Sequence, residues 1–244
     1  MVQLLSKEES ALKIRIKFAK RGSLKFIGHL DVMRYFQKVI KRAKIDIAYS
    51  EGFSPHQKMS FAAPLGVGLN SEGEYVDIEV NSTTSSKEAV ERLNQVSVED
   101  IPILSYRLLP DNATKAMTLV CAADYRLDIR AGYEPIFDLK TAFTRFMEQE
   151  SIVIVKETKK SQREVDLKPL ILKYEAFDSY VCLQLVTGSV ENLKPELVMD
   201  ALYNFMNTEL APFTFQITRL EVYGKKSEEE DILIPLESFG EEIE

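Results

Sequence analysis

Two series of strand-like and helix-like segments follow each other along this chain in the same order, and this repetition most constrains the fold. The first series reads strand, helix, strand, strand, helix, strand, and it begins with an alternation of apolar and basic residues over 12–18. From Met117 the order recurs, with corresponding elements starting roughly 105–112 positions later. This order is typical of the ferredoxin-like βαββαβ unit, an antiparallel sheet with two helices on one face. The sequence therefore predicts an α+β protein made of two tandem ferredoxin-like halves.

The predicted division places one half at residues 1–112 and the other at 113–224, followed by an acidic tail at 225–244. The halves share no convincing residue identity, so a single larger α+β domain is the alternative. In the tail, eight acidic residues surround one apolar stretch at 232–236. This composition predicts a solvated terminal segment with one docked piece, and the alternative is a tail that lies on a cationic face of the protein.

The basic residues are concentrated near the N-terminus. Between Ala11 and Ser60 there are twelve basic and three acidic residues, a net charge of +9, whereas the whole chain of 244 residues carries −7. A cationic region on an acidic protein indicates a local anionic partner such as RNA. The alternative is a solvated face whose charge is balanced by the acidic tail.

Two predicted elements and one loop carry these cations. Residues 12–18 alternate with period two, which predicts a half-buried strand with basic residues on its outer face. From about His29 to Lys44, apolar residues recur at helical spacing and basic residues fall on the opposite side. The candidate nucleic-acid-binding residues are Arg15, Lys17, Arg34, Lys38, Lys41, Phe53 and Lys58.

The loop at 50–58 holds the most informative side chains. It is framed by glycine and proline, and an aromatic residue there among basic neighbours can stack on a base, although Phe53 could equally enter the core. Both histidines of the chain, His29 and His56, follow turn-forming residues, and as a pair they could act as general acid and base on RNA. The alternatives are a histidine that opens a helix and one exposed in a loop.

Several classes of protein do not fit the composition. Two cysteines and two histidines form no cluster with zinc-ligand spacing, so neither a metal nor another cofactor is expected. No apolar run approaches the length that crosses a bilayer, and the first residues lack a signal core. A cytoplasmic protein without membrane contact is expected.

The run GHLDVMRYFQKVIKRA, followed by AYSEGFSPHQKMSFAAPLGVG and SEGEYVDIEV, resembles the bacterial radical-SAM-linked protein family, a domain of unknown function. The likeness covers roughly residues 26–79, and the segment 163–169 in the second half is also similar to the family. What the resemblance implies is association with a radical SAM enzyme in RNA maturation or ribosome assembly. The cluster of such an enzyme needs three closely spaced cysteines, and Cys121 and Cys182 cannot supply them.

The expected function is therefore a non-catalytic RNA-binding adaptor acting with a radical SAM enzyme. A looser architectural likeness to the tandem ferredoxin-like endoribonucleases that process CRISPR repeats keeps an alternative open. That alternative is an RNA-processing or RNA-modifying enzyme that uses His29 and His56. A third interpretation is a module that binds a small molecule.

Overall fold

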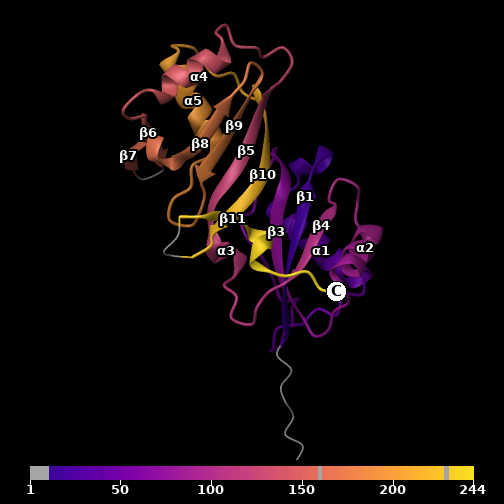
Figure 1. Ribbon diagram of the computed structural model, residues 1–244. Coiled ribbons are helices and arrows are strands. Elements are labelled where there is room, and N and C mark those ends of the chain that lie inside the picture. The colour runs from indigo at the N-terminus through magenta and orange to yellow at the C-terminus, as the bar shows by residue number, and fades with distance from the viewer. Residues whose placement is uncertain (1–10, 159–160, 228–230) are drawn as a thin grey trace, which may run out of the picture. The chain divides into compact units, whose positions relative to one another are not determined.

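The computed structural model describes residues 11–158, 161–227 and 231–244, and it is mixed α+β with five α-helices in that part of the chain (Figure 1). The chain divides into two compact units. Among the described residues, the first unit takes in 11–67, 74–119 and 235–244, and the second takes in 68–73, 120–227 and 231–234. The last ten residues thus complete the unit formed by the first half of the sequence.

The first unit contains three principal strands and two principal helices. In chain order its elements are β1 (Leu12–Lys20), η1 (Gly22–Phe26), α1 (His29–Arg42), β2 (Met59–Phe61), most of β3 (Asn70–Val80), α2 (Ser86–Val96), β4 (Ile103–Leu108), α3 (Ala116–Leu119) and η3 (Leu236–Phe239). The strands lie in the order β4, β1, β3, and β2 pairs with β3 in antiparallel register.

One face of this sheet packs against α1 and α2. Ile14, Ile16 and Phe18 alternate along β1 and are completely buried, and they meet the apolar stripe of α1. Phe36 of that stripe lies with its ring centroid 4.5 Å from that of Phe18 and 5.7 Å from that of Phe61. The helix forms because its apolar residues recur on one side, and burial of this stripe stabilises it.

The second unit contains a four-stranded antiparallel sheet and two helices. Its elements are β5 (Val120–Ile129), α4 (Leu139–Met147), β6 (Val153–Thr158), β7 (Ser161–Asp166), η2 (Lys168–Leu170), β8 (Ile171–Ala176), β9 (Tyr180–Val186), α5 (Pro195–Phe205), β10 (Phe215–Lys225) and most of β11 (Leu233–Pro235). The sheet order is β8, β9, β5, β10, while β6 and β7 form a separate hairpin.

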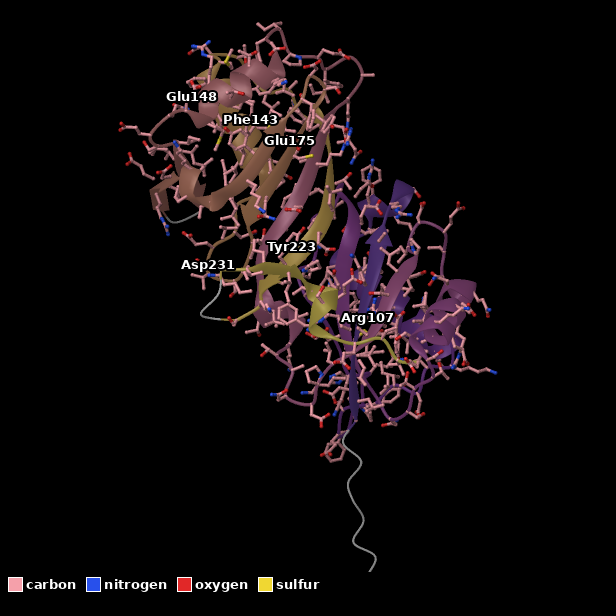
Figure 2. All side chains as sticks on the ribbon, viewed as in Figure 1. Arg107, Phe143, Glu148, Glu175, Tyr223 and Asp231 are labelled. Atoms are coloured by element: carbon pink, nitrogen blue, oxygen red, sulfur yellow. The ribbon has the colours of Figure 1, made fainter. Side chains whose placement is uncertain are left out.

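Helices α4 and α5 pack on one face of this sheet. Val181, Leu183 and Leu185 alternate along β9 and are buried. Phe143 of α4, labelled in Figure 2, contacts the ring of Tyr174, which lies opposite Leu183 in the register of β8 and β9. This face is therefore the helix-covered one, and the alternate side chains of the same strands point to the other face.

The predicted α+β class with mostly antiparallel strands is confirmed, and the tandem ferredoxin-like arrangement stays a prediction. The second strand of the first predicted series corresponds to the short apolar segment 45–49, and this segment forms only isolated bridges at Ile47 and Tyr49. The first residues of β3 pair in parallel with β10 inside the second unit, so this strand contributes to both units. A repeat of two sequential halves does not anticipate such a shared strand.

Candidate nucleic-acid interface

Helix α1 exposes a row of cations on its solvent side. Val32, Phe36, Val39 and Ile40 form its buried face. On the opposite side, Arg34, Lys38, Lys41 and Arg42 are all exposed. The predicted facing of this helix is confirmed, because burial follows the apolar spacing.

Most of these cations have no acidic partner. Arg34 lies 3.6 Å from Asp31, and both side chains are well exposed, so water screens this pair strongly. Within the described part of the chain, Lys38 and Lys41 make no ion pair. Their charge therefore remains available to an anion.

The loop at 50–58 next to α1 is ordered by local hydrogen bonds. The Ser50 hydroxyl lies 2.8 Å from Nδ1 of His56 and accepts the backbone N–H of the same histidine at 3.1 Å, while the Ser50 N–H donates to the His56 carbonyl at 2.9 Å. Tyr49 and Gln57 form a β-bridge at the base of the loop. Gly52 takes a φ of +106°, a conformation that favours glycine, and it turns the backbone just before Phe53.

Phe53 stands at the tip of this loop with its ring wholly in solvent. Its relative exposure is 112%, the largest among the exposed apolar residues of the described chain. The alternative that Phe53 enters the core is wrong in this structure. An ordered loop thus holds an aromatic ring in water, where it is free to stack on a partner.

A side-chain contact places the loop beside the cationic row of the helix. The Gln57 amide donates to the backbone carbonyl of Gln37 at 3.3 Å. Gln37 is one helical turn from Lys41 and from Arg34, which are four residues after it and three before it. The loop carrying Phe53 and the row carrying Arg34 and Lys41 are therefore neighbours on one surface, which we call the α1–loop surface.

Lys58 lies at the end of the loop, and its charge is paired with an acidic side chain. Its ammonium lies 2.7 Å from the Glu79 carboxylate, and this hydrogen bond raises the pKa of Lys58. Its exposure of 40% leaves it at the margin of the α1–loop surface.

The two histidines have separate partners. The ring of His29 packs edge-on against Phe61 at 5.2 Å between centroids, and His56 is held by Ser50. Among the described residues neither imidazole contacts the other. Both are exposed, and no acidic side chain hydrogen-bonds to either ring within the same described residues.

The predicted outward cationic face of β1 is wrong. Arg15 is completely buried, because its guanidinium donates to both carboxylate oxygens of Asp77 at 2.8 and 3.0 Å and to the carbonyls of Leu236 and Thr114. Lys17 is mostly covered, and its ammonium lies 2.7 Å from Glu237. Arg15 has no free donor surface for a phosphate, so we remove it from the candidate interface.

The C-terminal segment 235–244 covers this side of β1. Leu236 is fully buried, and Glu241 exchanges two backbone hydrogen bonds of 2.8 Å with Leu108. The backbone N–H of Ser86 donates to Ile243, whose own N–H donates to the Ser86 hydroxyl. This described part of the tail therefore lies on cationic side chains, since Glu237 contacts Lys17 and Glu242 contacts Arg107. Such a placement is the alternative that the composition of the tail raised.

Sequence reasoning missed the apolar part of the α1–loop surface. Leu30 on α1 is 61% exposed and Tyr49 before the loop is 52% exposed. Leu30 lies outside the apolar stripe of the helix, and this departure from the helical period was the available signal.

The comparisons with known proteins identify a family. The model of a family described as an uncharacterized protein conserved in bacteria (DUF2344) matches residues 13–195, which is most of the chain. The chain therefore belongs to this uncharacterised bacterial family. A search of curated proteins finds no match.

Two further observations limit the kinds of site. Within the described ranges, no three histidine, cysteine or acidic side chains come together as metal ligands. No helix in the same ranges combines the length and apolar character needed to span a membrane.

Proposed function

We propose that this protein is a non-catalytic RNA-binding adaptor whose α1–loop surface holds unpaired RNA. The observation that carries the proposal is that Phe53 is fully exposed on an ordered loop whose base contacts α1, the helix that carries the exposed cations. Cations along a helix attract the phosphates of a nucleic acid strand, and an exposed ring stacks on a base for about 1–3 kcal/mol.

The surface favours unpaired RNA over a duplex. A base within a helix is already stacked on its neighbours, so a protruding phenylalanine finds its partner in loops, bulges and single strands. Leu30 on α1 and Tyr49 before the loop are also exposed apolar side chains, whereas a surface for duplex phosphates needs only charge.

The wider role in the proposal comes from the sequence resemblance. The radical-SAM-linked likeness supports a partnership with a separate radical SAM enzyme in RNA maturation or ribosome assembly. In this role the protein presents the RNA and the partner performs the chemistry. A pull-down of a purified radical SAM enzyme with the full chain tests this part of the proposal separately.

The alternative of an RNA-processing enzyme rests on His29 and His56. Their separate partners, Phe61 and Ser50, do not favour a shared acid–base role. Incubation with total RNA tests this directly, since an adaptor shifts the RNA on a gel and leaves it intact. Cleavage that disappears in His29→Ala or His56→Ala would favour the enzyme.

The central experiment measures binding of a labelled single-stranded RNA as a function of salt. The triple variant Arg34→Ala/Lys38→Ala/Lys41→Ala should weaken binding and reduce the slope of log affinity against log salt by about 2, because each lost contact with a single strand contributes about 0.7. The matched control is Lys140→Ala/Arg145→Ala/Lys194→Ala, which removes the same charge from exposed positions of the second unit. Absence of binding by the wild-type chain at about 50 mM salt, or equal losses in the two triple variants, would reject the proposal.

A further inference from the structure

The second unit carries a hollow on the face of its sheet that α4 and α5 leave open. Gln184 and Cys182 alternate with the buried leucine and valine residues of β9 and so belong to the open face. The hollow has a volume of about 1270 Å³ and extends from β8 to the residues that precede and begin β11. This is large enough for a small organic molecule.

Three side chains form a hydrogen-bonded group in the floor of the hollow. One Asp124 oxygen accepts from the Gln184 amide at 2.9 Å, and the other accepts from the Tyr223 hydroxyl at 2.7 Å. Because Asp124 needs donors on both sides, these bonds fix the orientation of the amide and use the only proton of the phenol. Gln184 is more than nine-tenths buried, and among the described residues its amide oxygen has no hydrogen-bond partner. The floor therefore offers acceptors and has little to donate.

The charged side chains around the floor also favour a ligand that donates hydrogen bonds. Figure 2 labels Glu175 on β8, Tyr223 on β10 and Asp231 before β11, three elements that border the hollow. Of the two lysines that line it, Lys225 is already held 2.7 Å from Asp231. Burial raises the pKa of the Cys182 thiol, the nearby charge of Arg126 opposes this shift, and the charges of Glu175, Asp128 and Asp124 add to it. Three acids line the hollow against two lysines, so its lining carries an excess of negative charge. This excess favours a positively charged group.

The rim of the hollow is apolar on the side of β11. Leu220, Ile232 and Leu233 contribute to it, and Leu172 contributes from β8. Ile232 is 51% exposed, so the rim leaves apolar surface uncovered. A ligand that suits both parts has an apolar body and a charged head rich in N–H donors.

The geometry points to a binding site for a guanidinium, amidinium or ammonium group attached to an apolar body, with Asp124 as the principal acceptor. The head group would donate to Asp124 and lie within the field of Glu175, while its body would cover the rim at Leu172 and Leu233. Such a charge-assisted contact in a partly buried site is stronger than one between neutral groups. This site belongs to the second unit and is separate from the α1–loop surface of the first.

Benzamidine and benzamide form a matched pair of probes, since they share a ring and a planar head and differ chiefly in charge. Titration of the full chain by calorimetry should show benzamidinium binding at least about tenfold more tightly than benzamide, the ratio expected of one charge-assisted hydrogen bond. Agmatine and N-acetyl-arginine amide then distinguish a free small molecule from an arginine side chain of a polypeptide, according to which binds more tightly.

Two variants connect the binding to the named side chains. Asp124→Asn keeps the shape of the floor and should weaken benzamidinium binding at least about tenfold, and Glu175→Gln on the exposed rim should weaken it less without touching the floor. Glu191→Gln, an exposed acid outside the hollow, is the control and should bind as the wild type does. Equal affinities for benzamidine and benzamide, or unchanged benzamidinium binding in both hollow variants, would overturn the inference.

Discussion

At the scale of single residues, Arg15 and Phe53 of the first unit have a burial opposite to the one typical of their residue types. Arg15 is completely buried and Phe53 is completely exposed. A buried guanidinium is tolerated because four acceptor atoms surround it, two from Asp77 and one each from Leu236 and Thr114. The exposed Phe53 has no such compensation among the described residues, and in the proposed function its ring stacks on a base of the RNA.

The two phenylalanines Phe36 and Phe53 should respond oppositely to truncation. Phe36→Ala removes a fully buried ring that packs on Phe18 and Phe61, so we expect a loss of about 3–5 kcal/mol in the free energy of unfolding. Phe53→Ala should leave this free energy nearly unchanged and weaken binding of single-stranded RNA by about 1–3 kcal/mol. Urea unfolding and fluorescence anisotropy measure the two effects. Equal stabilities of the two variants would contradict the burial of Phe36.

Arg15 should behave as a structural residue. Arg15→Ala leaves the Asp77 carboxylate without the guanidinium that pairs with it, and loss of one partner of a buried pair costs about 3–5 kcal/mol. Lys38→Ala on the exposed side of α1 is the control and should change stability by less than about 0.5 kcal/mol. A mild effect of Arg15→Ala, within the range of the control, would mean that water reaches this guanidinium.

At the scale of elements, α1 and the C-terminal segment illustrate two kinds of order. Helix α1 follows from local spacing, because the residues that meet the core recur every three or four positions. The C-terminal segment has no such period. It is held by Leu236, by pairing with Leu108 and by the contact of Glu237 with Lys17, all of which depend on residues over a hundred positions away.

Glu237 makes the docking of this segment dependent on pH. Burial raises the pKa of its carboxyl, but the hydrogen bond and charge of Lys17 with the charge of Arg107 outweigh burial, so the pKa lies below its ordinary value of 4.5. A lowered pKa in the folded state stabilises the protein above pH 4.5, and this stabilisation is lost as the pH falls through the folded-state value. The protection of the Glu241 amide against hydrogen exchange, expressed relative to its intrinsic rate at each pH, should therefore fall below pH 4.5 in the wild type.

The matched variants for this pH effect are Glu237→Gln and Glu244→Gln. The first should remove most of the change in protection of the Glu241 amide between neutral and acid pH, because the glutamine side chain at position 237 does not titrate. The second removes an exposed acid at the end of the chain and should keep the change. A pH profile that is the same in Glu237→Gln and wild type would assign the effect to another group.

At the scale of the whole molecule, each of the two units is assembled from segments that are not contiguous in the sequence. The first unit is completed by residues 235–244, and the second unit includes 68–73 from the first half of the sequence. The acidic C-terminal residues therefore do more than solvate a terminus. They cover apolar and cationic side chains of the first unit.

Truncation after Ile232 should destabilise the protein, although the acidic composition of the tail predicts a solvated segment with only one docked piece. The truncated chain loses the burial of Leu236 and one acceptor of the Arg15 guanidinium, and together these should lower the free energy of unfolding by about 3 kcal/mol or more. Thermal melts of the truncated and full chains measure the difference, with removal of Glu244 alone as the control. Unchanged stability of the chain that ends at Ile232 would show that the segment contributes little.

Much of the fold and part of the interface could be read from local patterns. The class α+β, the facing of α1 and the exposed cations Arg34, Lys38 and Lys41 all follow from spacing within one element. The same reasoning was wrong for Arg15, because alternation tells which residues share a face of a strand and cannot tell whether another segment covers that face. It also left the position of Phe53 open.

Periodicity, polarised charge and membership of an uncharacterised bacterial family can all be read directly from the order of residues. Three other features emerge only when the chain is folded: β3 contributes to both units, the C-terminal segment covers β1, and the hollow in the second unit collects Asp124, Gln184 and Tyr223. The physical reason is the range of the interactions. Periodicity reports neighbours one turn or one strand step apart, whereas these features join residues that are far apart in the chain and meet only once the sheets have formed.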